Sequence, residues 1–186
     1  MATQSHRPLP DPGDRHLPRY SQRPLPAYRY VPGVHPHPVR DPGGHSYEPV
    51  RVSRPHTPWS PQEWRQLDDW RYGVDLFNRF YFWEAHEAWE GLWATAAAGR
   101  PPALLLQGLI QIAAALLKTH MHVVAGARTL STEGLNKVAR AARTQRTLLG
   151  LELEDIVERF TEFFAPLDDN RLPVLGSHVP VLRLAE

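Results

Sequence analysis

The sequence contains no cysteine, and this absence removes several kinds of chemistry at once. Without thiols the chain cannot form a disulfide, use a thiolate as a nucleophile or bind a metal through sulfur. Any metal must therefore be held by histidine, carboxylate or amide groups. Such ligands favour hard or borderline divalent cations, so Zn, Mn and Mg are the candidate cofactors.

Long hydrophobic runs and a strong charge of either sign are also missing. The N-terminal residues lack the apolar core of a signal peptide. The longest apolar run, ALLLQGLIQIAAALL, is short for a membrane-spanning helix and contains two glutamines. The formal net charge is only +1, with a mildly basic N-terminal third and a mildly acidic remainder. We therefore expect a soluble, cytoplasmic protein without a membrane or nucleic-acid partner.

Proline is common but unevenly distributed. Thirteen of the nineteen prolines lie in residues 1–60, which excludes regular helices and central strands from that part of the chain. We expect residues 1–24 to form a mobile tail. Residues 25–50 contain three tyrosines among their turn residues, so we expect this stretch to lie extended across the folded body.

The remainder of the chain carries the hydrophobic pattern of about five helices. Ser60, Pro61 and Glu63 have the spacing of a capping box, which predicts a first helix from here to about Asn78. Further helices are expected at about 81–97, 102–122, 124–149 and 151–164, and the third is apolar all round, as a buried helix would be. The predicted fold class is all-α, a compact bundle with a proline-rich extended N-terminal segment packed on it.

Three parts of the chain follow from this pattern. Residues 1–57 form an extended segment rich in proline, histidine and arginine, and residues 58–166 form the helical domain. Residues 167–186 are expected to be an irregular tail that is apolar enough to dock on the domain.

The stretch YFWEAHEAWEGLW, residues 81–93, places three glutamates and a histidine among five aromatic rings. At about 100° per residue, His86 and Glu90 fall on the aromatic face of the predicted helix, which we expect to be buried, and Glu87 lies at its edge. His86 and Glu90 are one helical turn apart, so they can form a hydrogen bond or share a ligand. Glu84 is expected on the opposite face.

The third helix provides the expected facing wall. If its polar row meets the aromatic face, two amide side chains can hydrogen-bond His86 and Glu90 and fix how the helices pack. We favour this structural interpretation over a chemical site. The polar row consists of Gln107, Gln111, Lys118 and His122.

A metal or acid/base site is the alternative interpretation of the same stretch. His86, Glu87 and Glu90 could bind a divalent metal, with Glu87 and Glu90 as candidate catalytic carboxylates. The spacing differs from the Glu-x-x-His of di-metal bundles and from the His-Glu-x-x-His of zinc proteases. The candidate binding residues are Glu84, His86, Trp89, Trp93, Gln107, Gln111, Lys118 and His122.

A second candidate metal site lies in HPHPVRDPGGH. Its turn residues could bring His35, His37 and His45 together around one ion. Proline-rich polar loops also collect histidines without binding a metal, and we favour that interpretation.

Several of these motifs together resemble a known family. GVDLFNRFYFWEAHEAWEGLW, followed by LLQGLIQIAAALLK and GARTL, is similar to the small helical family catalogued as domain of unknown function 309, over about residues 70–150. The resemblance implies a compact all-helical bundle and no established activity. Phe80 stands where such sequences usually have glycine between the first two helices, so we expect a looser break than a sharp turn there.

Two functions of different class are open at this point. The first is a non-catalytic binding or scaffold domain for an unknown small molecule or protein, able to form a homo-oligomer. The second is a metal-dependent, hydrolase-like enzyme that uses His86, Glu87 and Glu90 at a site between helices. Solvent access to Glu87 and Glu90 distinguishes the two functions, because an active site needs a cavity and an entry path.

Overall fold

The computed structural model of the chain describes residues 7–13, 16–49 and 58–185. This part of the chain forms five α-helices, two short 3-10 helices and one pair of two-residue strands. The predicted all-α fold class is confirmed, including the packing of the N-terminal segment on the bundle. In chain order the elements are η1 (Pro61–Gln66), α1 (Asp68–Asn78), α2 (Phe82–Thr95), α3 (Pro101–His120), α4 (Val124–Ala142), β1 (Thr147–Leu148), β2 (Leu151–Glu152), α5 (Leu153–Phe164) and η2 (Ala165–Asp169).

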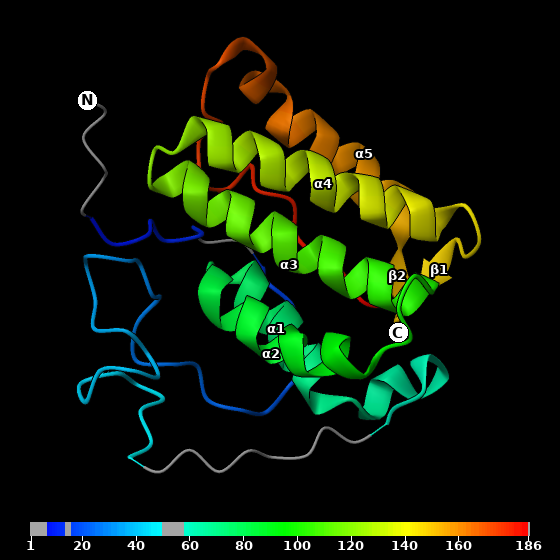
Figure 1. The fold of residues 1–186 in the computed structure, drawn as a ribbon, viewed down its shortest axis with the longest axis horizontal. Coiled ribbons are helices and arrows are strands. Elements are labelled where there is room, and N and C mark those ends of the chain that lie inside the picture. The colour runs from blue at the N-terminus through cyan, green and yellow to red at the C-terminus, as the bar shows by residue number, and fades with distance from the viewer. Residues whose placement is uncertain (1–6, 14–15, 50–57, 186) are drawn as a thin grey trace.

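Helix α3 lies at the centre of the bundle (Figure 1). It packs between α2 and α4, while α1 packs on α2 and α5 packs on α4. Helix α3 is long and apolar enough to cross a membrane, but 61% of its apolar 18-residue stretch is buried inside the bundle. This burial agrees with the prediction that the third helix is the buried element of the fold.

Helices α3 and α4 approach each other closely at a pair of glycines. A Cβ atom on Gly134 would lie 2.8 Å from the carbonyl oxygen of Gly108. A Cβ atom on Gly108 would lie 2.7 Å from Cγ2 of Val138. Gly134 therefore interrupts the hydrophobic pattern of the fourth helix because the two backbones meet at this position.

The start of the helical domain differs from the capping-box prediction. The structure contains a separate 3-10 helix, η1, and α1 begins only at Asp68, because Leu67 between them is extended, with ψ of 91°. The Ser60 hydroxyl donates to the Gln62 side chain at 2.8 Å and does not cap the helix. The predicted capping box is therefore wrong, although a helical element does begin at Pro61.

Helix α1 ends in a sharp turn at Phe80, which has a left-handed φ of 65°. The N–H of Phe80 donates to the Phe77 carbonyl at 3.0 Å and that of Tyr81 donates to the Leu76 carbonyl at 2.9 Å. These are the two bonds of a Schellman C-cap, so the expected looser break is wrong. The Phe80 side chain is fully buried and stacks on Phe82, and this burial offsets the strain of the left-handed backbone.

Helix α4 ends at Ala142, so its predicted end near Leu149 is wrong. Leu149 and Gly150 have φ values of 51° and 78° and form the two-residue turn between β1 and β2. Positive φ at both central positions matches the twist of a two-residue hairpin. The Leu149 carbonyl accepts a 3.0 Å hydrogen bond from Trp70 Nε1, which attaches the hairpin to α1.

The N-terminal segment runs along α1 and α2, in the lower left of Figure 1. Leu9, Ser21 and Val31 are all buried. The expectation that residues 1–24 form a mobile tail is therefore wrong for 7–13 and 16–24. Residues 1–6 and 14–15 lie outside the described part of the chain.

The C-terminal tail also docks on the helices, with Val179, Leu182 and Leu184 buried. The N–H of Ala185 donates to the Gly150 carbonyl at 2.8 Å, so the end of the tail lies against the β1–β2 turn. Both ends of the described chain are thus packed on the same helical body.

The glycine contact between α3 and α4 gives a first prediction. We expect Gly134→Ala to lower the free energy of unfolding by about 1–3 kcal/mol, because the added methyl group overlaps the backbone of α3. Urea denaturation followed by circular dichroism measures this change. Gly176→Ala is the matched control, since no atom lies within 4 Å of a Cβ there, and it should change stability by less than about 0.5 kcal/mol. Equal stabilities of the two variants would contradict the close approach.

Candidate functional site

Helix α2 presents a different face to the core from the one predicted. Phe82, Ala85 and Trp89 are buried, whereas the Glu90 residue is exposed. Trp89 fixes the rotation of α2 about its own axis, because its indole fills the space that a side chain at Gly73 of α1 would need. The prediction that His86 and Glu90 share the buried face is therefore wrong.

His86, Glu87 and Glu90 nevertheless lie close together on the outer side of α2. One ligand atom from each can be chosen so that all three lie within 4.8 Å of one another, and His86 Nδ1 is 3.6 Å from Glu87 Oε1. The side chains of His86 and Glu87 are 30% and 36% exposed. The group could hold a divalent cation. All three residues belong to one helix, as predicted, but they lie on its outer side and not at the expected site between helices.

The polar row predicted on the third helix does not form the expected wall, because Gln111 of α3 bonds to α4 and not to α2. Gln111 donates to Glu133 at 2.7 Å and accepts a 2.9 Å hydrogen bond from Lys137, and both partners belong to α4. The predicted network that joins Gln111 to His86 and Glu90 is therefore wrong. Among the other candidate binding residues, Trp93, Gln107 and Lys118 are partly buried and His122 is exposed.

Glu84, which was expected on the exposed face of α2, is one of the most buried polar residues of the bundle. Its side chain is 5% exposed. Glu84 Oε1 accepts a hydrogen bond from the backbone N–H of Tyr30 at 2.9 Å and lies 3.0 Å from Nε2 of His45. The N-terminal segment therefore covers a helix face that the helical periodicity alone assigns to solvent.

Burial raises the pKa of Glu84 above its ordinary value, and the hydrogen bonds from His45 and Tyr30 partly oppose this shift. The second carboxylate oxygen, Oε2, is buried and has no hydrogen-bond partner among the residues that the structure describes. The contact of Glu84 with Tyr30 and His45 is therefore closed to solvent, and removing the carboxyl group from water costs free energy.

Aromatic rings pack against His35, His37 and His45 of the N-terminal segment. The Tyr28 ring lies 4.9 Å from that of His35 and 4.6 Å from that of His45, measured between centroids. His37 packs against Trp83 at 5.3 Å. In the described ranges the His86 group is the only set of three or more metal-ligating residues, so the candidate site at His35, His37 and His45 is not assembled.

A second buried carboxylate, missed by the sequence analysis, lies on α1. Asp75 is fully buried and accepts hydrogen bonds from the backbone N–H groups of Tyr20 at 2.9 Å and Ser21 at 2.8 Å. Arg19 and Arg79 lie 3.5 and 3.7 Å from its oxygens. Burial raises the pKa of Asp75, and the two backbone N–H groups and the two guanidiniums oppose the shift.

Asn78, one turn after Asp75, holds the other end of the chain. Its amide donates to the Leu182 carbonyl and accepts from the Leu182 N–H, both at 2.8 Å, in the manner of a neighbouring strand. The hydroxyl of Tyr20 accepts a 2.9 Å hydrogen bond from the N–H of Leu184. The N-terminal segment and the C-terminal tail therefore meet beside α1.

Other side chains of α1 and of the turn between α1 and α2 donate to backbone carbonyls of the N-terminal segment. Each donor is a hydroxyl or guanidinium group, and each acceptor lies between residues 17 and 26. The bonds run from Arg79 to Leu17 at 3.3 Å and to Pro18 at 3.0 Å, from Arg71 to Tyr20 at 2.8 Å, from Tyr72 to Pro24 at 2.8 Å and from Tyr81 to Pro26 at 3.2 Å. We call this set of donors, together with Asp68, Asp69, Asp75 and Glu84, the segment-binding face.

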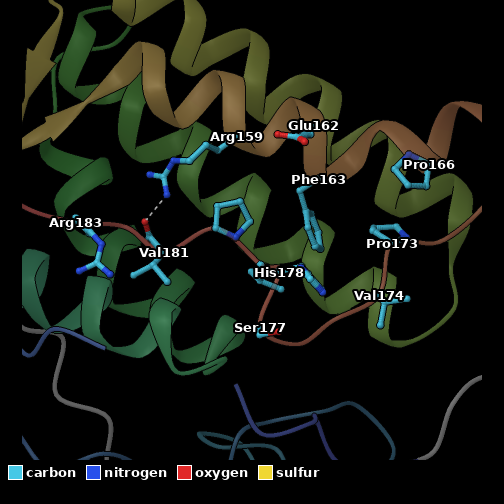
Figure 2. Close-up of a pocket in the computed structure, with 12 residues that line it drawn as sticks. Arg159, Glu162, Phe163, Pro166, Pro173, Val174, Ser177, His178, Val181 and Arg183 are labelled. Carbon is cyan, nitrogen blue, oxygen red and sulfur yellow. Dashed lines mark hydrogen bonds between the residues drawn. The ribbon is translucent and has the colours of Figure 1, made fainter. Parts of the chain in front are cut away.

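A hollow of about 590 Å³ lies between α5 and the C-terminal tail (Figure 2). Phe163 and Val174 provide apolar surface, and Val174 is 77% exposed. The Arg159 guanidinium is already engaged, since it donates to the Val181 carbonyl at 3.1 Å and pairs with Asp155 at 2.6 Å. None of the residues predicted from the sequence lines this hollow.

The raised pKa of Glu84 gives a second prediction. The folded protein keeps this proton to higher pH than the unfolded chain, so the free energy of unfolding should fall as pH rises from the ordinary glutamate range to the raised pKa. Glu84→Gln should remove this part of the slope, which begins in the ordinary glutamate range and extends to the raised pKa. Urea denaturation at a series of pH values measures it. The exposed Glu154→Gln variant should keep the parental slope, and identical slopes in both variants would contradict the assignment.

Comparison with known proteins identifies a family for the central part of the chain. No curated protein matches the sequence. A family model described as Domain of unknown function (DUF309) matches residues 70–130, which span α1, α2, α3 and the start of α4. The matched residues include Asp75, Asn78 and Glu84, and also the group of His86, Glu87 and Glu90. The match confirms the resemblance to this family that was found in the sequence, over residues 70–130.

Proposed function

We propose that the protein is a non-catalytic binding or scaffold domain whose segment-binding face holds extended polypeptide. One observation carries this proposal: Asp75, Asn78 and Glu84 are buried, and all three make hydrogen bonds to backbone N–H groups of the chain's own terminal segments. In this proposal the bound partner is a protein segment and not a small molecule. Cytoplasmic location and homo-oligomer formation stay predictions from the sequence.

The chemistry of these groups favours binding over catalysis. A catalytic carboxylate must reach a substrate, whereas Asp75 and Glu84 are covered by the segment that they hold. Hydrogen bonds that a carboxylate accepts from backbone N–H groups do not depend on the side chain of the residue that is held. Such groups suit a surface that takes an extended chain.

Removal of the Asp75 carboxylate tests the proposal. We expect Asp75→Ala to lower the free energy of unfolding by about 3–5 kcal/mol, because it strands two backbone N–H groups and the Arg19 and Arg79 guanidiniums. Thermal denaturation measures the loss, and limited trypsin digestion should cut after Arg19 and Arg29 faster than in the parent.

The matched control is Asp155→Ala on α5, outside the segment-binding face. Asp155 pairs with Arg159, but its side chain is 54% exposed, so we expect a change of less than about 1 kcal/mol. If the Asp75 variant melted and digested like this control, the segment would not be held by α1 and the proposed function would be wrong.

A metal-dependent enzyme is the second candidate function, and the closeness of His86, Glu87 and Glu90 supports it. A histidine and two carboxylates suit Zn or Mn, and Glu87 or Glu90 could act as a base toward a metal-bound water. Against it, Glu90 is exposed, so the group lacks the water-excluding walls that strengthen such chemistry.

Elemental analysis of the purified protein separates the two candidates. Under the first proposal we expect Glu90→Gln to fold as stably as the parent, within about 0.5 kcal/mol, and to have an unchanged metal content. Glu133→Gln on α4 is the control for loss of one negative charge. A stoichiometric metal ion that is present in the parent and the control but lost in a well-folded Glu90→Gln variant would favour the enzyme.

A further inference from the structure

We propose that the segment-binding face recognises basic, proline-rich peptides with the pattern Tyr-Ser-x-Arg-Pro-x-Pro supplied by another protein. Residues 20–26 of the chain, YSQRPLP, fill the face as a built-in ligand. This inference rests on the proposed function and adds the class of partner that the face takes.

The two prolines of the pattern are recognised through their carbonyl groups. Pro24 accepts a 2.8 Å hydrogen bond from the Tyr72 hydroxyl and Pro26 accepts a 3.2 Å bond from the Tyr81 hydroxyl. Proline has no N–H group and holds φ near −65°, so a proline-rich chain presents its carbonyls from a backbone that is already extended. Aromatic side chains that offer donors to such carbonyls are the common way of binding proline-rich peptides.

The other residues of the pattern are recognised by acidic groups on α1. The Ser21 hydroxyl donates to Asp68 at 2.8 Å, and the N–H groups of Tyr20 and Ser21 donate to the buried Asp75. Ser21 is 1% exposed, so a larger side chain has no room at this position.

Arg23 supplies the charge of the pattern. Its guanidinium lies 4.0 Å above the centre of the Tyr72 ring and 2.6 Å from an oxygen of Asp69. The same tyrosine therefore stacks on the arginine and donates to the carbonyl of the next residue, Pro24. A partner must place an arginine directly before the first proline to make both contacts.

The side chains of the two variable positions make no hydrogen bond or ion pair with the face within the described part of the chain. Gln22 is exposed and Leu25 is 36% exposed. Residues 17–19 and Tyr30 add further hydrogen bonds and an ion pair outside the pattern. A peptide of residues 16–31 contains all of these groups and can make the contacts in trans.

The built-in segment also limits access to the face. Because it is tethered to the body through residues 50–57, its effective concentration is on the order of millimolar, and a partner competes against it. Free peptide should therefore bind the intact chain weakly and bind strongly once the tether is cut.

The test keeps the face occupied throughout, so the body never has to fold alone. Residues 50–57 are replaced by a recognition site for a specific protease, the folded protein is cut, and a fluorescent peptide of residues 16–31 is added. Fluorescence anisotropy should report saturable exchange of the labelled peptide for the resident fragment. Uncut protein should need at least about tenfold more peptide for the same signal.

Matched changes on both sides test the pattern. An Arg23→Gln peptide should bind about tenfold more weakly or worse, whereas a Leu25→Ala peptide should bind within about twofold of the parent. In the body, Tyr72→Phe keeps the ring and removes the hydroxyl, and should weaken binding by about 3- to 10-fold.

Three results would overturn the inference. No exchange after cutting, or equal binding of the Arg23→Gln and Leu25→Ala peptides, would mean that the segment is permanent structure or is packed without sequence preference. Dimers of the uncut chain that disappear with Arg23→Gln would assign the occupant to a second copy of this chain. The proposed function fails separately, through an Asp75→Ala variant whose segment stays protected from trypsin.

Discussion

The burial of one carboxylate on α1 ties the N-terminal segment to the helical body. Asp75 has no exposed surface, and a buried charge is tolerated only when hydrogen bonds and opposite charges surround it. Three of its four neighbours, the N–H groups of Tyr20 and Ser21 and the guanidinium of Arg19, come from the N-terminal segment, and only Arg79 comes from the helices. The segment and the bundle are therefore coupled, because Asp75 leaves water only when the segment docks and supplies these partners.

The same constraint explains why polar residues gather on one side of the bundle. Asn78 follows Asp75 by one turn and binds the backbone of Leu182, and Glu84 follows on α2 and binds that of Tyr30. A compact bundle could cover this side with another helix. Here irregular chain covers it, and irregular chain brings backbone N–H and carbonyl groups that need partners. Side chains of α1 and α2 supply those partners where a neighbouring strand or helix would otherwise do so.

The sequence predicted the helices well because their hydrophobic period is local information, but it predicted the site poorly. The period gives the faces of a helix relative to one another, not the element that will cover each face. Glu84 was predicted to face solvent because hydrophobic periodicity gives no sign that an extended segment will cover that face. His86 faces outward because the Trp89 indole packs against Gly73 and fixes the rotation of α2 about its axis. The one usable signal was compositional, since a freely solvated linker has no need of the tyrosines at residues 25–50.

The glutamates of α2 show how the N-terminal segment divides one motif into two environments. Glu84 and Glu87 are one helical turn apart, yet the first is 5% exposed under the segment and the second is 36% exposed beside His86. Desolvation raises the pKa of Glu84, and the backbone N–H of Tyr30 is its fixed hydrogen-bond donor. Such a group suits a role in holding a chain in place. Glu87 and Glu90 keep access to water and to ions. A single helix can therefore carry a buried binding contact on one side and a solvent-exposed set of metal-ligating groups on another. Which side is buried depends on where the N-terminal segment covers the helix, and not on the helix itself.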